Sequence, residues 1–114
     1  MLRGTTITIV AILVSATAAF ADPIQGHWRT ARGDTAAIEA CGGGFCINLK
    51  TGPWKGRSIG SMSAEGSNRY SGTITDPETD KTYSGNATLT GSHLKLQGCV
   101  LGGLICKGQT WSRI

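Results

Sequence analysis

The sequence predicts an all-β fold, a small up-and-down antiparallel barrel of about eight strands. It contains 17 glycines in 114 residues and few helix-forming runs after residue 21. Short segments that alternate between apolar and polar residues recur between turn signals, as half-buried strands do. Gly26-His27-Trp28 near the start is matched by Trp111 near the end, which is expected if the first and last strands pair to close the sheet.

The first half of the chain contains four predicted strands separated by glycine, proline and polar residues. Gly33 and Asp34 indicate the first turn, Gly52 and Pro53 indicate a longer loop, and the polar stretch 64–69 is expected to be a loop as well. The four predicted strands are residues 24–30, 36–41, 46–50 and 58–62.

The second half is more regular and predicts four more strands. Residues 70–75 and 82–89 flank a turn in which Pro77 presets one backbone dihedral, so we expect a hairpin there. Residues 94–100 and 109–114 then complete the sheet. No long helix is expected. A sandwich or a half-open sheet is the alternative, because many glycines and few aromatic residues can leave a full barrel poorly filled.

Four residues are assigned structural roles in closing the sheet: Gly26, Trp28, Trp111 and Arg113. Trp28 is large enough to plug one end of a small barrel. Arg113 is expected to lie over its indole, a cation–π contact that contributes roughly 0.5–2 kcal/mol.

The N-terminus predicts a secretory signal peptide over residues 1–21. Arg3 supplies the positive charge, residues 7–14 the apolar core, and Ala19-Phe20-Ala21 a small-x-small cleavage site. Cleavage after Ala21 predicts a periplasmic or secreted protein that consists of one domain, residues 22–114. No later apolar run reaches the roughly 18 residues that a transmembrane helix needs, so no span is expected after cleavage.

The cysteines Cys41, Cys46, Cys99 and Cys106 are even in number and follow the predicted cleavage site. Small exported domains use such sets as disulfides, whereas a zinc site usually has tighter spacing and needs free thiolates. Three connectivities are possible. Loop entropy favours crossed pairs. Pairing of Cys41 with Cys46 and of Cys99 with Cys106 is nevertheless expected, because each pair brackets the tip of a predicted hairpin.

Several segments resemble the bacterial family called domain of unknown function 2147 (DUF2147). They are residues 24–30, 38–42 with Cys46, 76–78 with 81–85, and 109–113. The resemblance runs along nearly the whole of residues 22–114 and implies an exported protein of lipocalin-like fold. It implies no reaction, ligand or catalytic residue. The chain departs from the family between residues 50 and 59, where members are usually longer, and at Ile47, where they have glycine.

No catalytic constellation is found, so an enzyme is not expected. His27 and His93 lack partners at metal-ligand spacing. Asp76, Glu78 and Asp80 alternate, but without the glycine and distal glutamate of a calcium loop they fit a solvated turn better. No metal or other cofactor is expected, and an exported chain without interleaved basic and aromatic strand residues is not expected to bind nucleic acid.

Trp54 lies among the cations Lys50, Lys55 and Arg57. An exposed aromatic residue within a basic patch can bind an anionic surface or a partner protein. The favoured alternative is that Trp54 folds back over one mouth of the barrel while the cations remain in water.

Two classes of function remain for a monomeric barrel. The first is a carrier of a small apolar ligand inside the barrel. Its lining or floor is expected to comprise Trp28, Ile38, Leu49, Tyr70, Tyr83 and Leu96. The second is a rigid interaction or inhibitor module that binds an envelope protein through Trp54 and the apolar loop tips. The tip residues are Phe45, Leu101, Leu104 and Ile105.

Overall fold

A computed structural model describes Gly4 and residues 22–103 and 105–114. The predicted signal peptide, residues 1–21, therefore lies outside the described residues apart from Gly4. Leu104 and the side chain of Leu101 also lie outside them. Within the described ranges, no helix is both long and apolar enough to span a membrane.

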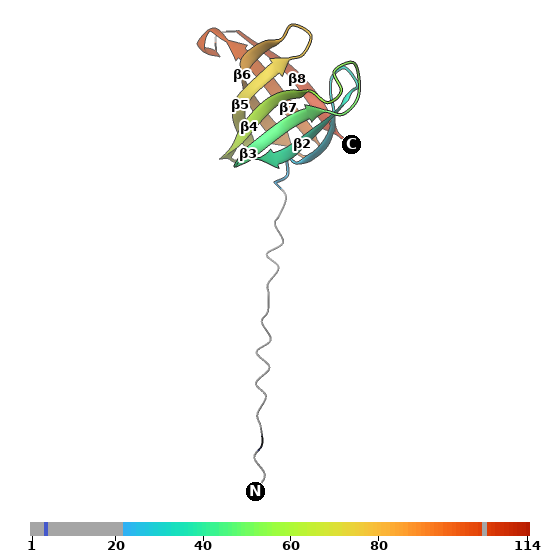
Figure 1. The fold of residues 1–114 in the computed structure, drawn as a ribbon. Helices are drawn as coiled ribbons and strands as arrows, with labels where there is room; N and C mark the ends of the chain where they lie inside the picture. The colour runs from blue at the N-terminus through green and yellow to red at the C-terminus, as the bar shows by residue number, and fades with distance from the viewer. Residues whose placement is uncertain (1–3, 5–21, 104) are drawn as a thin grey trace.

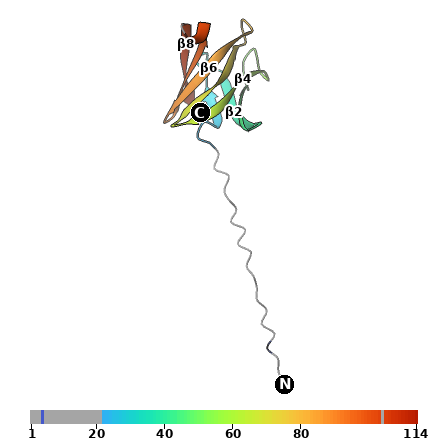
Figure 2. The ribbon, with the colours of Figure 1, turned by 90° about the vertical axis from the view of Figure 1, so that its left-hand side faces the viewer.

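The described residues form a closed antiparallel barrel in which each strand pairs with the next, and β8 returns to pair with β1 (Figures 1 and 2). This confirms the predicted fold class. The strands are β1 (Gly26–Arg29), β2 (Thr35–Cys41), β3 (Gly44–Leu49), β4 (Ser58–Gly66), β5 (Arg69–Asp76), β6 (Lys81–Thr90), β7 (His93–Val100) and β8 (Ile105–Arg113). A short 3₁₀ turn, η1 (Leu101–Gly103), follows β7.

Two stretches differ from the prediction. The polar stretch 64–69 is not a loop, because β4 continues to Gly66 and β5 begins at Arg69. Ser67 and Asn68, with φ of 54° and 60°, make the tight left-handed turn that lets the strands extend so far. The last strand was expected from residue 109 but begins at Ile105, because its first half pairs fully with β7.

The end of the barrel that receives residue 22 is closed by Trp28. Its side chain is fully buried, and its indole N–H donates a 2.9 Å hydrogen bond to the carbonyl of Ile24. The guanidinium carbon of Arg113 lies 4.2 Å from the centre of the Trp28 ring. Arg113 also donates hydrogen bonds to the carbonyls of Pro23 and Gln25. One arginine on the last strand thus holds both the plug and the segment that precedes β1.

The hydrophobic core extends from Trp28 toward the opposite end of the barrel. Phe45 and Tyr70 meet edge to face, with ring centroids 5.9 Å apart. Phe45 therefore packs inward, whereas Ile105 at the opposite end of the barrel is 52% exposed. Other large buried residues come from β2, β3, β4, β6, β7 and β8: Ile38, Ile47, Leu49, Ile59, Met62, Leu89, Leu94, Leu96 and Trp111.

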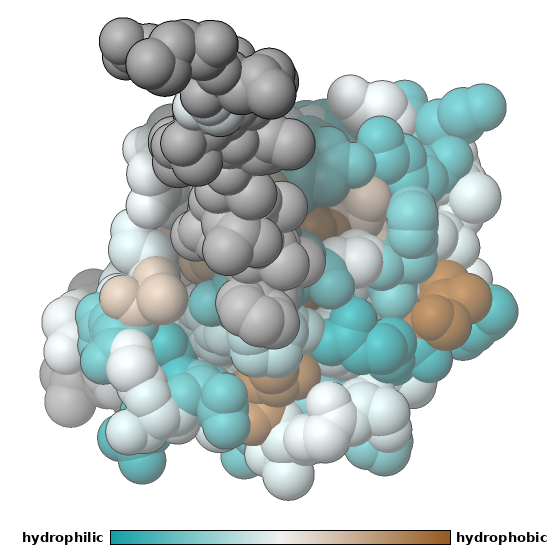
Figure 3. Space-filling model, turned by 90° about the horizontal axis from the view of Figure 1, so that it is seen from below, coloured by the Kyte–Doolittle hydropathy of each residue, from teal (hydrophilic) through white to brown (hydrophobic). Residues whose placement is uncertain are grey.

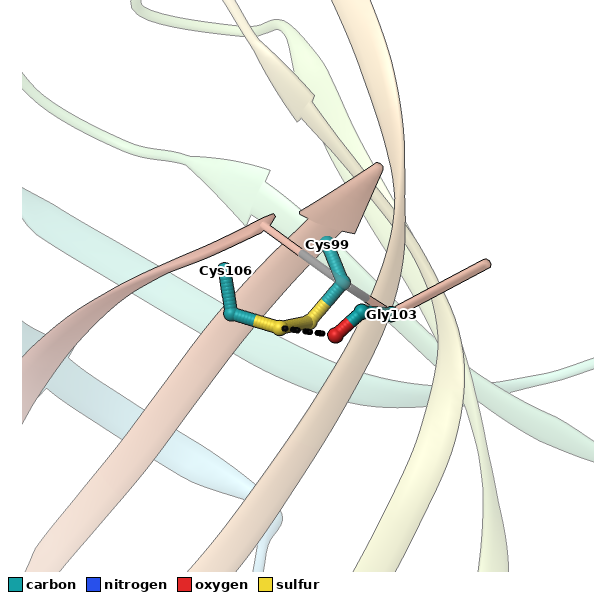
Figure 4. The surroundings of a disulfide bond; sticks show 3 residues. All are labelled: Cys99, Gly103 and Cys106. Carbon is teal, nitrogen blue, oxygen red and sulfur yellow. Dashed lines mark hydrogen bonds between the residues drawn. A yellow bond between two sulfur atoms is a disulfide. The ribbon is translucent and has the colours of Figure 1, made fainter. Parts of the chain in front are cut away.

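Two disulfides link neighbouring strands, and they confirm the predicted local pairing. Cys41–Cys46 joins β2 to β3 at the closed end, and Cys99–Cys106 joins β7 to β8 at the opposite end. The Cys106 sulfur lies 3.6 Å from the carbonyl oxygen of Gly103, and Figure 4 draws the two groups side by side. This is a contact and not a hydrogen bond, since a disulfide sulfur carries no proton. Each bridge closes a short loop, for which the loss of unfolded-state entropy is worth about 2 kcal/mol.

Seen from the closed end, the visible described surface is mainly hydrophilic, with hydrophobic residues scattered singly (Figure 3). Hydrophobic residues that are scattered singly are normal on the surface of a protein.

We predict that Trp28→Ala lowers the free energy of unfolding by about 3–5 kcal/mol, because it empties the plug and leaves the Arg113 cation without its ring. Urea unfolding followed by circular dichroism measures the loss. Trp54→Ala is the matched control and should cost less, since Trp54 is only half-buried. A Trp28→Ala protein within about 1 kcal/mol of the wild type would contradict the role of the plug.

Candidate functional site

A cavity of about 270 Å³ opens at the end of the barrel opposite Trp28. In an up-and-down barrel, alternate connections lie at the same end. The β1–β2, β3–β4, β5–β6 and β7–β8 connections therefore meet around this opening, and residues from the first three and from both strands of the fourth line it.

The floor of the cavity is apolar and comes from strands on all sides of the barrel. The floor residues are Leu49, Ile59, Ile74, Tyr83, Leu96 and Trp111. The Trp111 indole N–H is satisfied by Gln109, whose side-chain oxygen lies 2.8 Å away and also lines the cavity. A ligand on this floor therefore meets mainly carbon, with a polar amide at one side.

A row of glycines crosses three strands, and one of them, Gly98, lines the cavity. Gly72, Gly85 and Gly98 are neighbours across β5, β6 and β7, and the next residue in the row is Lys107 on β8. At each of the three glycines, atoms of neighbouring residues already occupy the space that a Cβ would take, so the row permits close packing. The glycine at position 85 has a packing reason too, since a Cβ there would lie 2.6 Å from Ile74.

Two arginines, Arg32 and Arg57, connect the loops on one side of the cavity mouth. The guanidinium carbon of Arg32 lies 4.6 Å from the centre of the Trp54 ring, and its Nη1 lies 3.4 Å from a carboxylate oxygen of Glu78. Arg57 pairs with Asp80 and donates a 3.2 Å hydrogen bond to the Pro77 carbonyl. These contacts connect the β1–β2, β3–β4 and β5–β6 connections. Both ion pairs are largely exposed, so each is worth no more than about 1 kcal/mol, and their effect is to position the loops.

The structure separates the residues that the sequence suggested for binding. Tyr83 and Trp54 line the cavity. Trp54 is half-buried and packs on the core, which agrees with the alternative in which it covers the mouth. Lys55 and Arg57 lie on the same β3–β4 connection but do not line the cavity. Trp28 and Tyr70 are buried in the packed core toward the closed end.

Sequence reasoning missed the charged rim, which consists of Arg32, Asp34, Asp76, Glu78 and Lys107. These residues lie in turns or near strand ends, where a single charged residue does not by itself indicate a binding site. The predicted strand order could have located the rim, because an up-and-down order places the first, third, fifth and seventh connections at the same end of the barrel.

Tyr70 forms a polar contact near the closed end. Its hydroxyl donates a 2.5 Å hydrogen bond to the carboxylate of Asp22. Burial raises the pKa of Tyr70 well above its ordinary value of 10.0, and the hydrogen bond to Asp22 and the negative charge of that carboxylate raise it further. The neutral phenol therefore links the segment before β1 to β5.

Among the described residues, no three histidine, cysteine, aspartate or glutamate side chains are grouped so that they could hold a metal ion.

A family model described as "Uncharacterized protein conserved in bacteria (DUF2147)" matches residues 47–113. Comparison with the curated proteins and with the solved structures gave no match.

We predict that the free energy of unfolding decreases as the pH rises above 10.0, the ordinary pKa of tyrosine. Above that pH the unfolded chain loses the Tyr70 proton while the folded chain retains it, so the folded state becomes relatively less stable. Below it, Tyr70 contributes no pH dependence. Urea unfolding between pH 8 and pH 11, to be compared with Tyr70→Phe, measures the effect. An equally steep decrease in the Tyr70→Phe protein would show that other groups cause it.

Proposed function

The chain belongs to the DUF2147 family of uncharacterized bacterial proteins, and from this premise we propose that it is an exported barrel that carries a small, largely apolar ligand in the cavity at its open end. The single observation that carries the proposal is the cavity of about 270 Å³ with an apolar floor and a charged rim. Ligand pockets in proteins commonly combine mainly apolar walls with a few placed polar groups.

The size of the cavity limits the ligand. Pockets for drug-sized molecules usually measure about 300–1,000 Å³, so this one, just below that range, fits a molecule of up to about three aromatic rings or a short chain. Polar atoms of the ligand would face Gln109 and the rim, and carbon would face Leu96 and Trp111. We expect affinity from burial of apolar surface, at about 25 cal/mol per Å² before the costs of association.

Export is part of the proposal. Both cysteine pairs form disulfides, which are typical of oxidising compartments, and residues 1–21 have the pattern of a signal peptide. A ligand carrier in such a compartment benefits from cross-links, because a domain of this size buries only about 60–65% of its unfolded surface.

The interaction module remains the alternative and receives less support. Trp54, its proposed aromatic anchor, is half-buried with Arg32 over its ring, and Phe45 packs on the core. Both side chains therefore offer less free surface to a partner than their positions in loops suggested.

We predict that the neutral fluorescent probe N-phenyl-1-naphthylamine binds the purified protein and that Ile74→Trp weakens this binding by about tenfold or more, because the larger ring fills the cavity. Fluorescence titration measures both affinities. Thr73→Trp is the matched control, since Thr73 is the exposed neighbour on the same strand and does not line the cavity. Equal loss in both variants, or no binding to the wild type, would contradict the proposal. Native mass spectrometry of the protein purified without refolding then gives the mass of any natural ligand.

We also predict that the protein recovered from the periplasm or medium of an expressing bacterium begins at Asp22, since the cleavage site follows Ala21. N-terminal sequencing tests this. An unprocessed Met1 terminus in protein that remains in the cytoplasm would contradict export while leaving the ligand proposal intact.

A further inference from the structure

The barrel is closed over only a short length between its first and last strands. β1 pairs with β8 through Trp28–Arg113 and Arg29–Ser112. Beyond Arg29 the chain turns back on itself, since the Thr30 amide donates to the Asp34 carbonyl at 2.8 Å. β7, by contrast, pairs with β8 along its whole length. The first half of β8 therefore has a partner strand on one edge only, within the part of the chain that the structure describes.

The hydrogen bonds at the end of β8 show which backbone groups face the unpaired edge. The Arg113 amide donates to Ser92 on the β7 side, and the Ile114 amide donates to His27 on the β1 side. In an antiparallel ladder the N–H and C=O of one residue point to the same side, and the side alternates along the strand. The groups of Cys106, Gly108 and Thr110 therefore point away from β7.

The disulfide supports this assignment independently. Cys99 and Cys106 lie directly opposite each other, and their Cα atoms are 4.1 Å apart. Residue pairs that do not exchange hydrogen bonds are about 4.5 Å apart, and those that do are about 5.5 Å apart. Cys106 therefore makes no ladder hydrogen bonds to β7. Every residue from Ile105 to Thr110 is also exposed to solvent.

We propose that this edge of β8 is a docking site for an extended acidic peptide segment of another protein, which adds to the sheet as a further strand. An unpaired edge is a template for such addition, in which main-chain hydrogen bonds supply affinity. The edge offers three N–H and three C=O groups from Cys106, Gly108 and Thr110. The exposed half of β8 is matched by a segment of about six residues at strand spacing.

Charge selects an acidic segment over a second copy of the chain. Lys107 is the one charged residue in the exposed half of β8, residues 105–110, and this half contains no acid. Two copies paired antiparallel about Lys107 would place the two Lys107 side chains opposite each other, and like charges on facing strands are destabilising. Glutamates on an added strand would instead lie beside Lys107. Gly108 carries no side chain, so a backbone can approach closely there.

The test uses fluorescence anisotropy with a fluorescein-labelled peptide of alternating glutamate and valine. Gly108→Pro removes the central N–H of the edge and is expected to weaken binding about tenfold or more. Gly108→Ala is the matched control that keeps the N–H, and its Cβ would lie 3.5 Å from the Leu96 carbonyl oxygen, an ordinary contact. It should bind within about twofold of the wild type. Binding of N-phenyl-1-naphthylamine in the cavity should survive Gly108→Pro, which separates this site from the ligand site.

Two changes in the peptide keep the test decisive if Gly108→Pro does not fold. N-methylation of every peptide amide should abolish binding, and replacement of glutamate by lysine should weaken it strongly. The proposal is overturned if the wild type does not bind the acidic peptide, if the methylated or lysine peptide binds equally well, or if folded Gly108→Pro binds as tightly as Gly108→Ala. It is also overturned if light scattering finds a dimer of the wild type that Gly108→Pro dissociates, because the occupant would then be a second copy.

Discussion

The burial of Trp28 is the interaction on which the rest of the barrel depends. β1 has only four residues and shares two residue pairs with β8, so ladder hydrogen bonds alone hold the closure weakly. The indole instead packs against the core and bonds to Ile24, while Arg113 covers its face and binds the carbonyls of the preceding segment. Closure is therefore achieved mainly by side chains, in contrast to the other strand pairs, which have longer registers.

The distribution of side-chain volume along the barrel axis follows from this plug. Large side chains gather toward the closed end, where Phe45 and Tyr70 meet and Trp28 is fully buried. Nearer the open end, apolar side chains such as Leu96 and Trp111 line the cavity without filling it. A small barrel filled evenly would have no cavity, because eight strands enclose only enough room for side chains or one small ligand. The uneven distribution of large side chains leaves a cavity at the mouth.

The sequence was sufficient for the fold, the strand order and the disulfides, because alternation, turn residues and cysteine spacing are local signals. It was less informative where one local pattern fits two structures. The polar stretch 64–69 has the composition of a loop, yet Ser67 and Asn68 accept left-handed backbone and allow a hairpin. Of the six residues suggested as the lining or floor of a cavity, Leu49, Tyr83 and Leu96 line the cavity, whereas Trp28, Ile38 and Tyr70 do not. The charged rim was not predicted, because Arg32 and Lys107 are far apart in the sequence and line the same cavity only through the closure of the barrel.

The short first strand links the two proposed sites. Because β1 ends at Arg29, the first half of β8 is exposed on one edge, and the same half borders the mouth of the cavity. Side chains alternate along a strand, so Lys107 and Gln109 line the cavity, while the backbone groups of the intervening Gly108 face the open edge. A strand added to this edge would continue the wall beside the mouth and bring its charges near Lys107. If a docked segment changes the affinity for a ligand in the cavity, the ligand must change the affinity for the segment by the same factor.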